Sequence, residues 1–252
     1  MKMLYACVAL FISGGNIALT QASQRTDKHE RVISFSGYDW LVKSSPNSET
    51  FGPGNNHFSD SSKNVWIDNK GWLHLKITHR NGKWYCAEVI LLKPLGYKKY
   101  IFQINGRVDR FHQNVVGGLF TYLDGMDGAE EIDIEFSGWG NDKNLYNAHY
   151  AIQPSDNLGN VQSFNFDLSE NAYTYSFDWK CGKVDFTSYQ GQYSSVPTDS
   201  SLVIRAWSYS GKNVPSNQNC KVHINLWLFQ RDKISANDHP EAEMIITSFL
   251  AL

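Results

Sequence analysis

Apolar side chains recur at every second position along much of this 252-residue chain. The pattern is clearest in residues 72–77, 175–179 and 222–229, and no segment shows strong helical periodicity. Period-two alternation is typical of strands that bury one face, and turn signals such as the run at 68–71 favour short connections between them. The sequence therefore predicts an all-β chain folded as a two-sheet sandwich over about residues 32–252.

Three acidic residues, Glu131, Asp133 and Glu135, share one face of a predicted strand at residues 131–136. The outer two lie roughly 13 Å apart at Cα, so their side chains must lean inward over Asp133 to meet. Hydrolysis of a glycoside with retention of configuration needs two carboxyl groups about 5–5.5 Å apart. Two other interpretations stay open at this point: an exposed strand face that happens to be acidic, and three carboxylates that hold a cation.

The first 22 residues have the pattern of a secretory signal. Lys2 gives a short basic start, an apolar run covers residues 3–12, and small residues at 20–22 precede a cleavage point. No segment is apolar for long enough to span a bilayer. We expect a signal peptide at 1–22, a single catalytic domain at 23–252, and a protein secreted to the extracellular space or the periplasm.

Charge and composition narrow the class of partner. Loss of Lys2 with the signal leaves 22 of the 23 Lys and Arg residues against 25 Asp and Glu residues, a net charge of −3. This balance gives no indication of a nucleic-acid or membrane partner. The chain has 8 Trp, 13 Tyr and 14 Phe residues, which serve a sandwich core and can also cover the apolar faces of sugar rings. A neutral polymer fits these properties.

Three cysteines follow the predicted signal: Cys86, Cys181 and Cys220. A bridge between Cys181 and Cys220 is one interpretation, since an exported protein folds in an oxidising compartment. Three unpaired thiols are the other. The spacing of the cysteines gives no zinc motif.

The motif Glu-Ile-Asp-Ile-Glu at 131–135 resembles the catalytic signature of glycoside hydrolase family 16, which includes lichenases, laminarinases and agarases. Further similar motifs follow the family's order over roughly residues 95–252, and they lie at 118–122, 147, 175–179, 224–227 and 243–249. The resemblance implies a β-jelly roll of the concanavalin A-like kind.

By this resemblance Glu131 is the nucleophile, Asp133 an assistant and Glu135 the general acid/base. The direct spacing of the three acids implies a regular strand without a bulge. Neighbouring negative charge should raise the pKa of Glu135, so that it holds a proton near neutral pH.

The resemblance and the alternation also nominate residues that bind substrate. Asn225 and Trp227 share the polar face of their strand, where an amide can hydrogen-bond a hydroxyl and an indole can stack on a sugar ring. Trp139 lies four residues after the acidic strand, and a packing role for it is an equal alternative. The full set of substrate-binding candidates is Tyr122, Trp139, Asn147, Asn225 and Trp227.

No metal site or required cofactor is predicted. His149 has no partner histidine at ligand spacing, so a structural role is the simpler interpretation. The family resemblance leaves open a structural calcium ion away from the cleft, although no Asp-rich loop specifies one.

These observations predict a secreted, monomeric endo-β-glycosidase that hydrolyses a β-glucan with β-1,3 or mixed β-1,3/1,4 linkages by double displacement. The first alternative is a transglycosylase, or a hydrolase of another β-linked wall polysaccharide. The second is a lectin-like domain that binds carbohydrate without catalysis.

Overall fold

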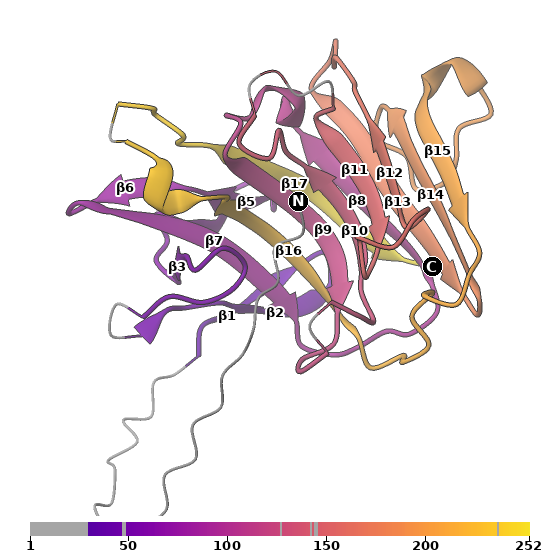
Figure 1. Cartoon of the computed structure of the whole chain (residues 1–252), viewed down its shortest axis with the longest axis horizontal. Helices are drawn as coiled ribbons and strands as arrows, with labels where there is room; N and C mark the ends of the chain where they lie inside the picture. Colours follow the sequence, from indigo (N-terminus) through magenta and orange to yellow (C-terminus); the bar gives the residue numbers. More distant parts are fainter. Residues whose placement is uncertain (1–29, 47–48, 127, 142, 144–145, 236) are drawn as a thin grey trace, which may run out of the picture.

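A computed structural model describes residues 30–252 except 47–48, 127, 142, 144–145 and 236. The predicted signal at 1–22 lies outside the described residues. The described strands form two stacked sheets, and nearly all strand pairs are antiparallel, with β3 beside β7 the parallel exception. The predicted all-β two-sheet sandwich is therefore confirmed (Figure 1).

The first sheet has ten strands, and eight of them follow one another in the order β1-β2-β7-β16-β9-β10-β11-β12. The short strands β3 and β6 both pair with the beginning of β7. The strands of this sheet are β1 (Val32–Phe35), β2 (Tyr38–Val42), β3 (His57–Phe58), β6 (Thr78–Arg80), β7 (Lys83–Leu91), β9 (Val115–Tyr122), β10 (Ile132–Phe136), β11 (Ala148–Ile152), β12 (Val161–Phe164) and β16 (Lys221–Leu228).

The second sheet has seven strands in the order β15-β14-β13-β8-β17-β5-β4. Its strands are β4 (Val65–Ile67), β5 (Leu73–Lys76), β8 (Lys99–Asn105), β13 (Ala172–Lys180), β14 (Lys183–Gln190), β15 (Val203–Tyr209) and β17 (Glu243–Ala251). The helices of the described residues are single 3-10 turns, η2 (Val108–Arg110), η3 (Ser200–Leu202) and η4 (Arg231–Lys233). None of these helices is long and apolar enough to cross a membrane.

Alternation along the strands decides which face is buried. In β16, Val222, Ile224 and Leu226 are fully buried in the core between the sheets, while His223 and Asn225 point to the opposite face. The alternating segments of the sequence analysis correspond to β5, β13 and β16, so those strand predictions are confirmed. At β16, the outer face of the first sheet is consequently lined by the polar half of the pattern, His223 and Asn225.

All three cysteines of the described residues are free thiols. Cys86 and Cys220 are buried, whereas Cys181 is exposed. The bridge between Cys181 and Cys220 is therefore not formed, and the alternative of unpaired thiols holds.

Candidate active site

A cleft of about 580 Å³ lies on the outer face of the first sheet. Its floor is built from cross-strand rows, because residues directly opposite each other in a sheet share a face. One row joins Glu135, Gly118, Asn225 and Glu88 across β10, β9, β16 and β7. The cleft therefore crosses the strands, and side chains far apart in sequence line it together.

The acidic ladder forms one side of this cleft. Glu131, Asp133 and Glu135 all line it, with Ile132 and Ile134 fully buried behind them. The strand β10 begins at Ile132, one residue later than predicted, although the N–H of Gln153 still donates to the Glu131 carbonyl at 3.1 Å. The pairing of β10 with both neighbours is regular, which confirms the prediction of a strand without a bulge.

Electrostatics differ along the ladder. Burial, and then the charge of Asp133, raises the pKa of Glu135 well above its usual value. The direction is the predicted one, but burial contributes more than the neighbouring charge that the sequence suggested. Burial also raises the pKa of Asp133 to about 6, against hydrogen bonds from Gln153 and with Glu131 that lower it. Glu135 is thus suited to carry a proton at neutral pH.

One residue at the end of β11 bonds to the ladder and another, within β11, lies beside it, and neither position was predicted. Gln153 Nε2 donates to Asp133 Oδ2 at 2.9 Å. His149 lies directly opposite Glu135 in the sheet, and its ring nitrogens contact Ser163 Oγ at 2.8 Å and the Ser137 carbonyl at 3.2 Å. Burial lowers the pKa of His149, so the imidazole stays neutral beside Glu135. Its contacts agree with the structural role expected from the sequence.

A buried charge network that was not predicted from the sequence lines the other side of the cleft. Glu88 accepts from Lys43 Nζ and from His223 Nδ1, each at 2.8 Å, and only 1% of Glu88 is exposed. Burial alone would raise the pKa of Glu88, but the hydrogen bond from His223 and the charge of Lys43 hold it below the usual value. Glu88 is therefore an ionised, fully paired floor residue.

Asn225 projects into the cleft beside a glycine that makes room for it. A Cβ at Gly118 would lie 2.5 Å from Asn225 Oδ1, so only glycine allows this amide position. The Oδ1 atom is buried without a hydrogen-bond partner among the described residues. A buried acceptor of this kind is suited to a hydroxyl group supplied by a ligand.

We expect Gly118→Ala to lower kcat/KM by about 10–100-fold, because the new methyl group must displace the Asn225 amide. The control is a double-mutant cycle with Asn225→Ala. If displacement of the amide is the cause, the double variant is no worse than Asn225→Ala alone. Fully additive losses would show that Gly118 acts through something other than Asn225.

Two of the predicted aromatic residues line the cleft and one does not. Tyr122 and Trp227 are lining residues, but Trp227 is only 7% exposed. Its ring meets those of Trp139 and Phe229 edge-on, at centroid distances of 6.1 and 6.5 Å. Trp139 itself is not among the lining residues and packs on Trp227, Phe229 and His149. The packing alternative therefore describes the position of Trp139.

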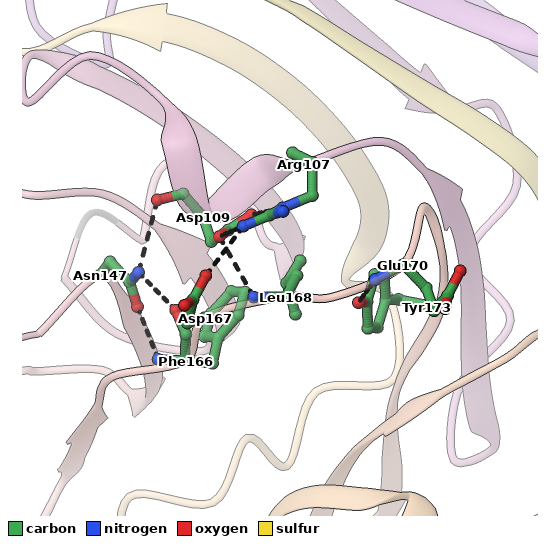
Figure 2. Close-up of polar contacts among 8 residues, drawn as sticks. All are labelled: Arg107, Asp109, Asn147, Phe166, Asp167, Leu168, Glu170 and Tyr173. Carbon is green, nitrogen blue, oxygen red and sulfur yellow. Dashed lines mark hydrogen bonds and ion pairs between the residues drawn. The ribbon is translucent and has the colours of Figure 1, made fainter.

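Asn147 lies outside the cleft, contrary to its predicted place in it. Its Nδ2 donates to the Phe166 carbonyl at 2.8 Å and the Asp109 carbonyl at 3.4 Å, and its Oδ1 accepts from the Phe166 N–H at 3.0 Å. Figure 2 shows these bonds beside the Arg107–Asp109 ion pair. Asn147 immediately precedes β11. Its amide therefore connects this end of β11 with the η2 turn at Asp109 and with the segment after β12 at Phe166.

No group of three or more His, Cys, Asp or Glu residues in the described part of the chain is arranged to hold a metal ion. The structural calcium ion left open by the sequence stays a prediction.

Comparisons with known proteins agree with this architecture. Two curated proteins named beta-glucanase, from Paenibacillus polymyxa and Paenibacillus macerans, are 28% and 30% identical to this chain over 169 residues. The matched part is 66% of this chain and 63% of the length of each relative.

The solved structure of a Bacillus licheniformis beta-glucanase is similar in fold, with a TM-score of 0.57 and 18% identity. The superposition covers 83% of this chain and 91% of that chain, which confirms the predicted jelly-roll sandwich. A family model described as glycosyl hydrolases family 16 matches residues 55–240. The chain therefore belongs to glycosyl hydrolase family 16.

Proposed function

We propose that this protein hydrolyses internal bonds of a β-glucan that contains 1,3 linkages, with retention of configuration. The observation that carries the proposal is the carboxylate ladder in the cleft. Burial and the charge of Asp133 raise the pKa of Glu135, and the carboxyl group of Glu131 lines the same cleft. Family membership and the name of the two Paenibacillus relatives support the same substrate class.

The proposed reaction has two steps on the carboxyl groups of Glu131 and Glu135. In the first, the Glu131 carboxylate attacks the anomeric carbon while Glu135 gives its proton to the glycosidic oxygen, and the C–O bond to the leaving sugar breaks. In the second, the Glu135 carboxylate takes a proton from water, and the hydroxide attacks the glycosyl ester from the opposite side. The sugar is released with its original configuration, and both carboxyl groups return to their starting states.

Asp133 has a positioning role in this proposal. Its charge helps to raise the pKa of Glu135, and its side chain lies within hydrogen-bonding distance of Glu131. Gln153 in turn fixes Asp133 from the end of β11. The three acids therefore act as a unit in which Glu135 is protonated and Glu131 is ionised.

The remaining lining residues suit a neutral polysaccharide. Asn225 Oδ1 offers an acceptor to a sugar hydroxyl, and Tyr122 and Trp227 supply ring edges or faces for sugar C–H groups. The cleft runs across β10, β9, β16 and β7, a shape that favours attack within a chain over removal of a terminal sugar.

We also propose that the protein acts outside the cytoplasm, on the basis of the pattern in residues 1–22, and that it works as a monomer without a cofactor. Determination of the N-terminus of the exported protein tests the first point, with Ser23 as the expected first residue.

The substrate is tested by incubating residues 23–252 with lichenan, laminarin, agarose and xyloglucan and sizing the products, with Glu131→Gln as the inactive control. We expect oligosaccharides of several sizes from lichenan or laminarin. Products longer than the starting acceptor would indicate a transglycosylase. Release of glucose alone, or cleavage of agarose but of no glucan, would contradict the substrate assignment. Binding without turnover of any polymer would favour the lectin-like alternative.

A further inference from the structure

A second cavity of about 320 Å³ adjoins the catalytic cleft. We use the name second cavity for the space bounded by Arg31, Leu41, Lys43, Ser44, Asp60 and Ile90. Two of these residues, Lys43 and Ile90, also line the cleft, so the two spaces meet along them. A polymer that leaves the cleft in this direction reaches the second cavity directly.

One cross-strand row connects the acids with this cavity. Asp133 lies opposite Phe120, Phe120 opposite His223, His223 opposite Ile90, and Ile90 opposite Leu41. The row crosses β10, β9, β16, β7 and β2, which is four steps of about 4.8 Å, or roughly 19 Å in all. All five side chains share the outer face of the sheet, so they form a continuous track from the ladder to the second cavity.

The apolar members of this track are suited to sugar rings. Phe120, Ile90 and Leu41 are each half-buried and present part of their surface on the outer face. The intervening His223 is bonded to Glu88 through Nδ1 at 2.8 Å, which leaves Nε2 as the ring nitrogen that can meet a ligand. The track thus offers apolar faces with a polar group between them, as a chain of sugar rings requires.

Lys43 marks the passage between the two spaces and is held in place there. Its ammonium group donates to the Gly52 carbonyl at 2.7 Å and to Glu88 Oε2 at 2.8 Å, and it lies 4.3 Å from the centroid of the Phe58 ring. The two hydrogen bonds use two of the three N–H donors of Lys43. The side chain is therefore a fixed rim that retains one donor for a passing hydroxyl group.

The polar groups of the second cavity indicate a neutral ligand. Glu30 also lines this cavity, so its lining holds two cations, Arg31 and Lys43, and two anions, Glu30 and Asp60, whose formal charges cancel. Arg31 Nη1 donates to the backbone carbonyls of Asp60 at 2.6 Å and Val65 at 2.9 Å, which fixes the guanidinium and leaves its other N–H donors. Donors, acceptors and an apolar floor at Leu41 are the combination that recognises hydroxyl groups on a ring.

We propose that the second cavity is a remote binding site for a sugar unit of the same polymer whose internal bond is cleaved at the ladder. The proposal rests on the proposed hydrolysis of a β-glucan and adds where the far part of the chain binds. Occupation of this site favours long chains over short ones, because a short oligosaccharide bound at the acids does not extend along the four strand spacings to Leu41.

The experiment measures kcat/KM for β-glucan oligosaccharides that increase by one sugar at a time and carry a label at the reducing end. The variant is Leu41→Trp, which fills the cavity, and Ser44→Trp is a second filling variant in case the first fails to fold. Leu250→Trp is the matched control, since Leu250 is a half-buried leucine of β17 that lines neither space.

We expect the wild-type kcat/KM to rise with length until the chain spans the track. The ratio of kcat/KM for long over short oligosaccharides should fall by about tenfold in Leu41→Trp and Ser44→Trp, the low end for loss of one pocket contact. The ratio should be unchanged in Leu250→Trp. The label identifies which end of the chain occupies the second cavity.

Two results would overturn the inference. An unchanged ratio in both filling variants would show that the cavity binds no part of the chain, and an equal loss at every length would show an indirect structural effect. If the wild type cleaves none of the oligosaccharides, the proposed function fails first and the inference falls with it.

Discussion

Replacing Glu131 by glutamine is expected to lower kcat by about 10⁴-fold or more, the scale seen when a nucleophile is removed from a double-displacement enzyme. The amide is close in shape to the carboxyl group but cannot form the glycosyl ester. The measurement is turnover of the best β-glucan together with thermal unfolding, which should stay near that of the wild type.

Azide tests the role of Glu131 more specifically. In Glu131→Ala, azide with an activated aryl glycoside should attack the anomeric carbon directly and give the inverted glycosyl azide. Turnover of Glu131→Gln close to that of the wild type, or a glycosyl azide of retained configuration from Glu131→Ala, would show that another residue is the nucleophile.

Replacing Glu135 by glutamine should lower kcat on natural substrates by about 10²–10⁴-fold, the usual contribution of a general acid. The loss should be much smaller for aryl glycosides whose leaving group needs no proton. In Glu135→Ala, azide should attack the glycosyl-enzyme and give a product of retained configuration. Equal losses on both substrate classes would contradict the assignment of Glu135 as the acid.

The raised pKa of Glu135 fixes the direction of the pH dependence. Activity needs the protonated form, so it should fall as the pH rises through this pKa, and Glu135→Ala should lose that alkaline limb on activated aryl glycosides. An identical limb in the variant would assign it to another group.

The stability of the folded state should also depend on the protonation of Glu135. A carboxyl group with a raised pKa in the folded state stabilises the fold below its unfolded pKa, and this contribution is lost as the pH rises through the folded pKa. Burying the ionised Glu135 is then unfavourable, so Glu135→Gln should unfold at the same or a higher temperature than the wild type at alkaline pH. This result would also show that its lost activity is not lost folding.

The strands and the ladder could be predicted because both depend on local alternation. Ile132 and Ile134 are buried in the core, and alternation along the strand therefore places Asp133 and Glu135 on the opposite face. In the same way, Val222 and Ile224 fix the outward direction of His223 and Asn225. The neighbouring strands β9 and β16 then complete the site around the motif at 131–135.

The buried network of Lys43, Glu88 and His223 could not be predicted, because its members come from separate parts of the sequence and meet through sheet order alone. The available signal was Glu88, a single acid in the otherwise apolar run Cys86–Leu91. A charge in such a strand needs a partner, although the sequence does not say which residue provides it.

Asn147 shows where spacing along the chain misleads. Its place in the order of the family's motifs suggested a position in the cleft, but the register of β11 sets His149 opposite Glu135. The connection between β10 and β11 decides that register, and its length in residues does not reveal the pairing. Trp139 is a similar case, since its left-handed backbone conformation (φ 53°) follows the strand and its ring packs on Trp227 and Phe229.

The configuration of the sugar that is released first tests the proposed double displacement most directly. Proton NMR of lichenan or laminarin oligosaccharides during the earliest turnover, before mutarotation, separates the two anomers. Double displacement through Glu131 and Glu135 predicts the β-anomer first, with the α-anomer appearing later by mutarotation. Initial release of the α-anomer would contradict the proposed mechanism at its centre.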